Sequence, residues 1–278
     1  MTRLFSCLKH FLKMPVHIAD MIKVARWVLR HAPHWNHIVI HRNAVEKLPK
    51  RLAVAMICGH VKGKLRCPSQ LTIILIHDYH SPPLMEMSLQ YVGINNYVVV
   101  KPPTAGPWRG SKKILAMNDY LRSGRCHSEY LLYCDSTDAV LRDDPAKAIT
   151  YLQEQKCDLL ISNTLFTADF EYQCMPQALA WADQRAREHG CTGLYINAGV
   201  FIGRTDFLRE VFDAAEPFVT DHDLCRDEER EYSHKGELAD QLPEFPKGIG
   251  SDQIIMRHLH PQFYPRMKID YKGQLALR

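Results

Sequence analysis

Short apolar runs alternate with amphipathic stretches from residue 71 onward, and their spacing predicts an α/β fold. The apolar runs are rich in Val, Ile and Leu and end at Gly, Pro or polar clusters, as buried strands do. Helical stretches of about ten residues separate them, which indicates a mainly parallel sheet covered on both faces. The predicted strands are 71–76, 97–100, 130–134, 158–162, 195–203 and an edge strand at 267–272. The predicted helices are 84–91, 111–121, one starting at 143–145, 177–189, 206–215 and a short one from Ser251.

Three stretches depart from this rhythm. The segment 163–176 is irregular, and the strand 195–203 contains a small polar turn with glycine, which marks a bulge or a close backbone approach. The segment 221–244 is densely charged and has few apolar residues. Long polar segments of this kind are insertions or mobile lids, and we predict one of these roles for it.

The first quarter of the chain has a different character. A helical pattern over 16–30 places Ile18, Met21, Ile22, Ala25, Val28 and Leu29 on one face. Such a basic amphipathic helix either packs its apolar face on the same protein or lies on an anionic membrane surface. We therefore divide the chain into a basic helical N-terminal extension, 1–69, and an α/β domain, 70–278.

Charge is distributed unevenly along the chain. Residues 1–70 hold 13 Lys and Arg against two acidic residues, a net charge of +11, whereas the remainder holds 22 basic and 29 acidic residues, a net charge of −7. The histidines at 31, 34, 37 and 41 lie among these basic residues without an acidic neighbour in sequence, so we interpret them as part of a solvated basic surface. The split suggests that the first quarter has its own task or an acidic partner.

Composition limits the cellular setting. With 46% apolar and 24% charged residues the chain has the composition of a globular protein, and no apolar run approaches the roughly 20 residues that cross a bilayer. The nine cysteines are scattered and form no CxxC pair. This pattern indicates neither a zinc site nor a disulfide framework and favours a cytoplasmic setting, with peripheral contact to a membrane as the alternative raised by the N-terminal helix.

Two carboxylates come directly after the apolar strand 130–134. Asp135 and Asp138 lie where the carboxyl end of a sheet strand places ligand-binding residues. Two close anions repel each other, and a hard divalent cation such as Mn²⁺ or Mg²⁺ relieves this repulsion while also binding phosphate. The alternative interpretation is a strand that ends in a polar turn, with Asp135 as a cap for the next segment.

Two helix starts carry further candidates. The stretch 106–113 opens a helix with glycines, a capping Ser111 and two lysines, and helix N-termini of this kind favour phosphate, although many such stretches are merely solvated. Asp252 lies in the first turn of the last predicted helix. A carboxylate is favoured there by the helix dipole, so its structural role competes with a catalytic one.

Several of these pieces agree in order and spacing with a known family. The pieces are 110–113 (GSKK), 134–140 (CDSTDAV), 195–203 (YINAGVFIG), 251–253 (SDQ) and 269–272 (IDYK). Together they resemble the glycosyltransferase domain of the procollagen lysyl hydroxylases, and behind it the GT-A fold of nucleotide-diphospho-sugar transferases. The resemblance covers residues 70–278 and leaves residues 1–69 without a counterpart.

The resemblance implies a role for each matching residue. Asp135 and Asp138 would be the metal-binding Asp-x-x-Asp motif, holding Mn²⁺ against the diphosphate of a UDP-sugar, and Asp252 would lie at the reacting centre. The residues that would bind the donor are Trp108, Gly110, Lys112, Lys113, Ser136, Asn197, Ala198 and Gly199. The family has a further metal-binding His where this chain has Tyr271. Either Asp270 replaces it, or water and phosphate complete the metal's ligands, or the site is weakened.

The expected function is a metal-dependent hexosyltransferase with a UDP-sugar donor and a hydroxyl acceptor on a glycan, protein or small molecule. One alternative is a nucleotidyltransferase of the same fold, but its usual Gly-rich, basic signature is replaced after the first strand by 77–83 (HDYHSPP). Another is a non-catalytic module that binds an acidic partner through the N-terminal region. Nucleic acid is the less favoured partner, and salt-sensitive binding to DNA or RNA would reveal it.

Overall fold

The computed structural model describes residues 20–30, 36–41, 45, 48–103, 110–165, 176–219 and 252–277. The predicted lid at 221–244, most of the irregular stretch 163–176, Trp108 and Ser251 lie outside the described residues.

A six-stranded sheet forms the centre of the fold, in the order β3-β2-β4-β7-β6-β8. Every pair is parallel except those that involve β7, which is antiparallel to both neighbours. The predicted mixed α/β architecture with a mostly parallel sheet is thus confirmed, and β8 is the edge strand that the sequence predicts. The strands are β2 (Leu71–Ile76), β3 (Tyr97–Val100), β4 (Tyr130–Cys134), β6 (Leu159–Thr164), β7 (Tyr195–Arg204) and β8 (Met267–Ile269).

The predicted polar turn inside 195–203 takes the form of a bulge within one long strand. β7 is continuous over ten residues, but its pairing with β6 shifts: Ile161 lies opposite Phe201 and Asn163 opposite Ile196. Residues 197–200 therefore face a single residue of β6. A bulge re-aims side chains and terminates regular pairing, and here it lies beside the end of β4.

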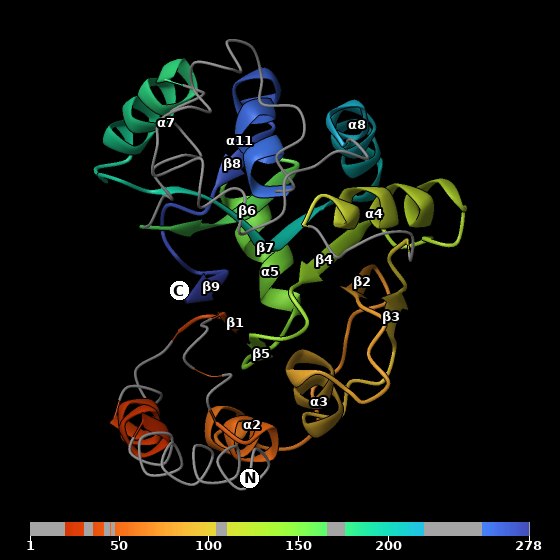
Figure 1. Ribbon diagram of the computed structural model, residues 1–278, viewed down its shortest axis with the longest axis vertical. Coiled ribbons are helices and arrows are strands. Elements are labelled where there is room, and N and C mark those ends of the chain that lie inside the picture. Colours follow the sequence, from red (N-terminus) through yellow and green to blue (C-terminus); the bar gives the residue numbers. More distant parts are fainter. Residues whose placement is uncertain are drawn as a thin grey trace, which may run out of the picture.

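Helices cover both faces of the sheet, and each face has its own apolar core (Figure 1). One core joins the sheet to α2, α3 and α5, and the other joins it to α4, α8 and α11. Alternate residues of β4 enter the two cores, Leu132 on one side and Leu131 on the other, as the two-residue period of a strand requires. The helices are α2 (Lys50–Cys58), α3 (Leu84–Tyr91), α4 (Lys112–Arg122), α5 (Ala146–Glu154), α7 (Pro176–Glu188), α8 (Thr205–Ala215), the 3₁₀ turn η3 (Glu216–Phe218) and α11 (Asp252–Phe263).

A second, three-stranded sheet joins distant parts of the chain. β1 (Val39–His41) lies between β5 (Ala139–Leu141), with which it is antiparallel, and β9 (Ala276–Leu277), with which it is parallel. Figure 1 shows β1, β5 and β9 together beside the end of the central sheet. Because β5 comes just after the two predicted metal-binding carboxylates, this sheet places the end of β1 next to them.

Part of the predicted extension belongs to the apolar core. β1 is fully buried, and α2 buries Ala53, Val54, Ile57 and Cys58. The interpretation of the histidines as a solvated basic surface is therefore wrong for His41, which lies in the buried β1, and α2 adds further apolar residues to the core. The boundary at residue 69 stays a prediction.

The N-terminal helical pattern is confirmed over 20–30. Met21, Val24, Ala25 and Val28 pack against the core, whereas Ile22 and Leu29, predicted on the same face, are 46% and 65% exposed. None of the helices among the described residues is long and apolar enough to cross a membrane.

The burial of α2 can be tested with two substitutions in the same helix. Ile57→Ala should lower the free energy of unfolding by about 2–5 kcal/mol, because it leaves a cavity in the core. Leu52→Ala, at a site 43% exposed, should change it by no more than about 0.5 kcal/mol. Urea denaturation followed by circular dichroism measures both, and equal effects would show that α2 is not packed as described.

Candidate metal centre

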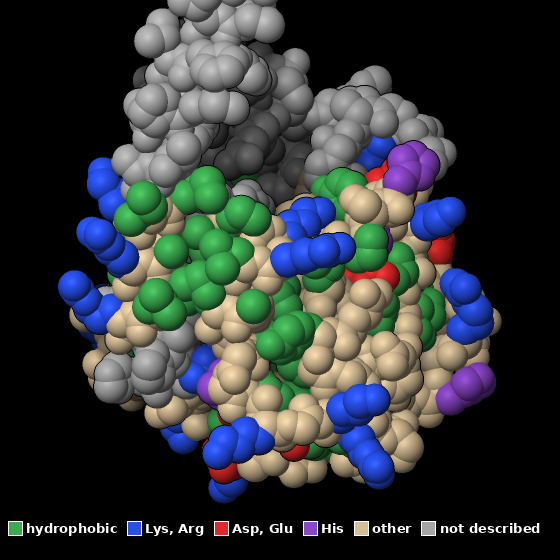
Figure 2. All heavy atoms as spheres, turned by 90° about the horizontal axis from the view of Figure 1, so that it is seen from below, with side chains coloured by type: hydrophobic (Ala, Val, Ile, Leu, Met, Phe, Trp, Pro, Cys, Tyr) green, Lys and Arg blue, Asp and Glu red, His purple; other side chains and the backbone are tan. Residues whose placement is uncertain are grey.

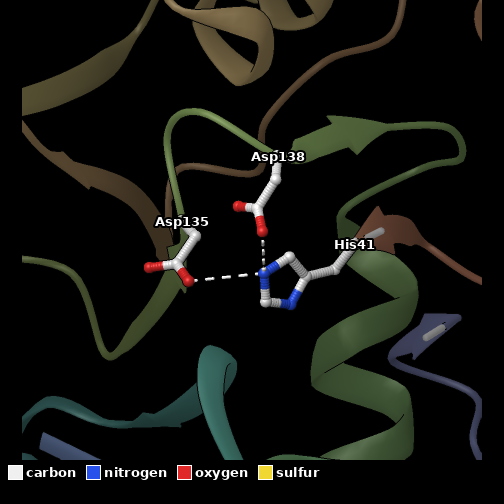
Figure 3. A group of neighbouring side chains, drawn as sticks. All are labelled: His41, Asp135 and Asp138. Carbon is white, nitrogen blue, oxygen red and sulfur yellow. Dashed lines mark ion pairs between the residues drawn. The ribbon is translucent and has the colours of Figure 1, made fainter. Parts of the chain in front are cut away.

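Three side chains converge at the carboxyl end of β4 (Figure 3). Asp135 and Asp138 lie on the loop between β4 and β5, and His41 reaches them from the end of β1, where it pairs with Ala139. His41 Nε2 is 3.3 Å from Asp135 Oδ2 and 3.1 Å from Asp138 Oδ2. One ligand atom of each residue lies within 4.8 Å of the others. This arrangement could hold a metal ion.

The state of His41 fits this interpretation. Its side chain is only 1% exposed, and within the described residues neither ring nitrogen has a hydrogen-bond partner of good geometry. Burial by itself lowers the pKa of His41, but the two carboxylates outweigh burial and raise that pKa to about 9. In the metal-free protein His41 is therefore an imidazolium between two carboxylates. A metal ion that binds there would displace this proton, because an imidazole nitrogen must be neutral to bind a cation.

Gly199 makes the approach of His41 possible. A Cβ atom at this position would lie 2.0 Å from His41 Cε1 and 2.6 Å from Asp135 Oδ2. Gly199 also fixes the end of β4, because its carbonyl accepts the N–H of Asp135 at 2.7 Å. Only glycine leaves enough space for the His41 ring here, and Gly199, which the resemblance assigns to donor binding, forms part of the wall of the candidate metal centre.

The second oxygen of Asp135 is held from the other side. The hydroxyl of the buried Tyr133 donates to Asp135 Oδ1 at 2.7 Å, and Lys113 Nζ donates to the same oxygen at 3.2 Å. Burial opposes ionisation of Asp135, but Lys113 and His41 outweigh it and hold the pKa of this carboxyl well below its usual range. Asp135 is therefore an anion with a fixed orientation, as a metal ligand must be.

Lys113 connects this group to the predicted catalytic residue. Its ammonium lies 2.7 Å from Asp252 Oδ2, at the first turn of α11, and both side chains are largely buried, Lys113 at 16% exposure and Asp252 at 15%. Burial lowers the pKa of Lys113, and the two carboxylates reverse this and raise it. The pKa of Asp252 is raised, because burial and the charge of Asp135 outweigh the attraction of Lys113.

The bulge of β7 holds the start of α11 through the side chain of Asn197. Asn197 donates from Nδ2 to Gln253 Oε1 at 3.0 Å and accepts the N–H of Gly199 at 3.1 Å. Ala198 is buried in the apolar core beside β7. Asn197 and Ala198, both predicted to bind the donor, thus lie within the site's framework, where Asn197 fixes the residue next to Asp252.

The remaining predicted donor-binding residues occupy mixed positions. Ser136 is buried, and its hydroxyl donates to the carbonyl of Ile76 at 3.4 Å, so it links two strand ends. Gly110 and Lys112 are half-buried at the start of α4, on the same turn as Lys113. The predicted capping role of Ser111 is wrong: this residue has helical backbone angles and makes no capping hydrogen bond.

The structure does not bring Asp270 to the other two predicted metal ligands. Asp270 is buried after β8, and its Oδ2 accepts the N–H of Leu275 at 2.6 Å, which closes the turn that leads to β9. Tyr271 stacks on His189 with ring centroids 4.4 Å apart. The third ligand position of the candidate centre therefore belongs to His41, which was assigned to a basic surface because its acidic neighbours are almost 100 residues away in sequence.

Two residues of the site, Tyr133 and His41, are not predicted from the sequence. For Tyr133 the sequence offers weak evidence: its hydroxyl stands in an otherwise apolar run, two residues before Asp135 and on the same face of the strand. For His41 the only evidence is the short apolar run at 38–40, two isoleucines and a valine, which indicates a strand. Neither pattern shows which residues the side chain will contact.

The titration of His41 generates a prediction for the metal-free protein. Its folded pKa, about 9, lies above the ordinary value of 6.5. The stabilisation is therefore complete below pH 6.5 and is lost as the pH rises to about 9. With a chelator present, urea unfolding should show stability falling over this window, and His41→Gln should remove the fall. If the His41→Gln variant still loses stability over this pH range, another titrating group causes the loss.

The contact between Gly199 and His41 predicts a coupled pair of substitutions. Gly199→Ala should destabilise the protein by about 1–3 kcal/mol, because the added methyl overlaps the imidazole. In a His41→Ala background the same substitution should cost clearly less, since the overlapping ring atoms are gone. Urea denaturation of the four proteins gives the coupling energy, and strict additivity would contradict the described packing.

No family model matches the chain, and a search of the curated proteins found no match. The geometry of the site therefore carries the functional argument.

Proposed function

We propose that this chain is a metal-dependent glycosyltransferase that transfers a sugar from a UDP-sugar to an acceptor hydroxyl. The observation that carries the proposal is the convergence of His41, Asp135 and Asp138 at the carboxyl end of a central strand. This is where open α/β sheets bind their ligands. The resemblance of the surrounding segments to GT-A glycosyltransferases supplies the reaction class.

The three ligand residues are compatible with Mn²⁺. Carboxylates suit Mg²⁺ and Mn²⁺, and an imidazole nitrogen is a ligand for transition metals, so the mixed set can accommodate Mn²⁺. When bound, the ion would supply positive charge to the diphosphate of the donor and stabilise UDP as the leaving group. Asp135 is oriented for this role by Tyr133 and Lys113.

Lys113 is suited to respond to the donor. In the structure its ammonium is shared between Asp135 and Asp252. A diphosphate brought to the centre offers this cation a third anionic partner. Lys113 would then hold the donor by a charge-assisted hydrogen bond, which agrees with the donor-binding role predicted for it.

Asp252 is our candidate for the general base. In an inverting reaction the acceptor oxygen forms a bond to C1 of the sugar, the bond from C1 to the phosphate oxygen breaks with its electron pair leaving on UDP, and the acceptor proton must be taken up. A carboxylate whose pKa is raised by burial is a better base than an ordinary one, and Asp252 has this property.

Space for a substrate adjoins the ligand loop. A cavity of about 300 Å³ is bordered by Thr137, which lies between the two metal-binding carboxylates in sequence. The other lining residues are Val45, Leu48, Lys50, Tyr79, Ser81, Pro83 and Leu84. This volume is at the lower end of the range for small-molecule sites, and its mixed lining supports the binding of part of a nucleotide-sugar or its acceptor.

The metal assignment can be tested at Asp138. Asp138→Ala should abolish Mn²⁺-dependent binding of UDP and leave the fold intact, because it removes one of three ligands from a partly exposed loop. Isothermal titration calorimetry with UDP, with and without Mn²⁺, measures the loss. Asp119→Ala, at an exposed position of α4, is the matched control and should bind as the parent does. Undiminished binding by Asp138→Ala would remove the basis of the proposal.

The role of Asp252 can be separated from its position at a helix start. Asp252→Asn should retain UDP binding but lower the transfer rate by about 10²–10⁴-fold, the usual contribution of a general base. Asp206→Asn makes the same change in the first turn of α8 and should leave the rate unchanged. Product analysis by mass spectrometry distinguishes transfer, which releases UDP, from a nucleotidyl transfer. Normal turnover by Asp252→Asn would reduce Asp252 to a structural residue.

A further inference from the structure

Hydrophobic side chains gather on the face of the molecule that lies beside the N-terminal helix (Figure 2). Helix 20–30 contributes Ile22 and Leu29, and the neighbouring α2 contributes Leu52, with exposed fractions of 46%, 65% and 43%. Together they are three of the seven large apolar residues that are exposed in the described part of the chain. Such a concentration on two adjacent helices marks an interaction surface rather than scattered exposure.

Positive charge borders these apolar side chains. Lys23, Arg26 and Arg30 are exposed on the outer side of helix 20–30, and Lys50 and Arg51 are exposed at the start of α2. On a helix with 3.6 residues per turn, Ile22 and Leu29 lie on one edge of the buried face, and Arg26 lies next to them on the solvent side. Asp20 is the one acidic residue among those the structure describes in 20–58.

We propose that this surface, the basic apolar face formed by Ile22, Leu29, Leu52 and their neighbouring Lys and Arg residues, binds an anionic lipid bilayer. Basic side chains are attracted to the charged headgroups while their stems lie along the interface, and the apolar side chains enter the boundary of the acyl chains. Charge complementarity favours lipid because the surface combines a single sign of charge with apolar side chains that a polar acidic partner would not cover.

The inner face of helix 20–30 holds the helix on the protein with its outer face toward solvent. Met21, Ala25 and Val28 already pack against the core, so the helix need not unfold or leave the protein to meet a membrane. The bilayer would hold the folded catalytic unit peripherally, and its acceptor would then be sought among molecules at a membrane surface. This surface shares no residue with the candidate metal centre, although Lys50 also lines the cavity beside the ligand loop, so either assignment can fail without the other.

Vesicle sedimentation with the full chain tests the proposal. The protein should co-sediment with vesicles of phosphatidylcholine and phosphatidylserine, should not do so with phosphatidylcholine alone, and should be released by salt. Ile22→Ser with Leu29→Ser should weaken the partition coefficient about tenfold or more, which corresponds to ~1.4 kcal/mol. Arg26→Glu with Arg30→Glu should do the same, and thermal unfolding should show that both variants remain folded.

Matched controls make the result specific. Val99→Ser with Leu165→Ser removes two exposed apolar side chains on other elements, and Arg125→Glu with Arg187→Glu makes the same change in net charge on the α4–β4 loop and α7. Both control proteins should bind vesicles as the parent does. The proposal is overturned if the full chain does not sediment with anionic vesicles, if it sediments equally with neutral ones, or if the controls lose as much binding. A change in oligomeric mass on Ile22→Ser with Leu29→Ser, with vesicle binding intact, would assign the surface to a second copy instead.

Discussion

The charge of Asp135 at the end of the central strand is the constraint on which the site depends. This carboxylate is largely removed from water, and it lies near a second one, Asp138. The fold offsets the charge with groups from three separate elements: Tyr133 from the strand itself, Lys113 from the start of α4 and His41 from β1. Moving any of these elements would leave an anion without its partner, so the geometry of the candidate site and the stability of the fold depend on the same contacts.

Local patterns predict most of the central sheet and half of the site. Strands such as 71–76 and 130–134 are found at the predicted bounds because each is a short apolar run with polar residues at its end. Lys113 and Asp135 are found together, close to Asp252, because a helix start and a strand end are positions that an open α/β sheet brings to one edge. In these cases the sequence around each residue determines its place in the fold.

His41 could not be placed in this way. The short apolar run before it indicates a strand but not its partner, and its carboxylate partners lie almost 100 residues further on, so its position depends on the pairing of β1 with β5. The structure places Asp270 apart from its predicted role: its sequence context resembles a metal ligand, whereas its carboxylate accepts the N–H of Leu275 in a local turn. The same turn leads into β9, which pairs with β1. Asp270 thus supports the candidate centre indirectly, through the strand that carries His41.

The position of β1 between β5 and β9 has a consequence for the newly made chain. A ribosome makes β1 first and β9 last among the strands described here. The strand that carries His41 is therefore made before both of its partner strands, which are formed by residues 139–141 and 276–277. Contacts of such long sequence separation form late in folding. The candidate centre therefore reaches its final arrangement only after residues 276–277 have been made.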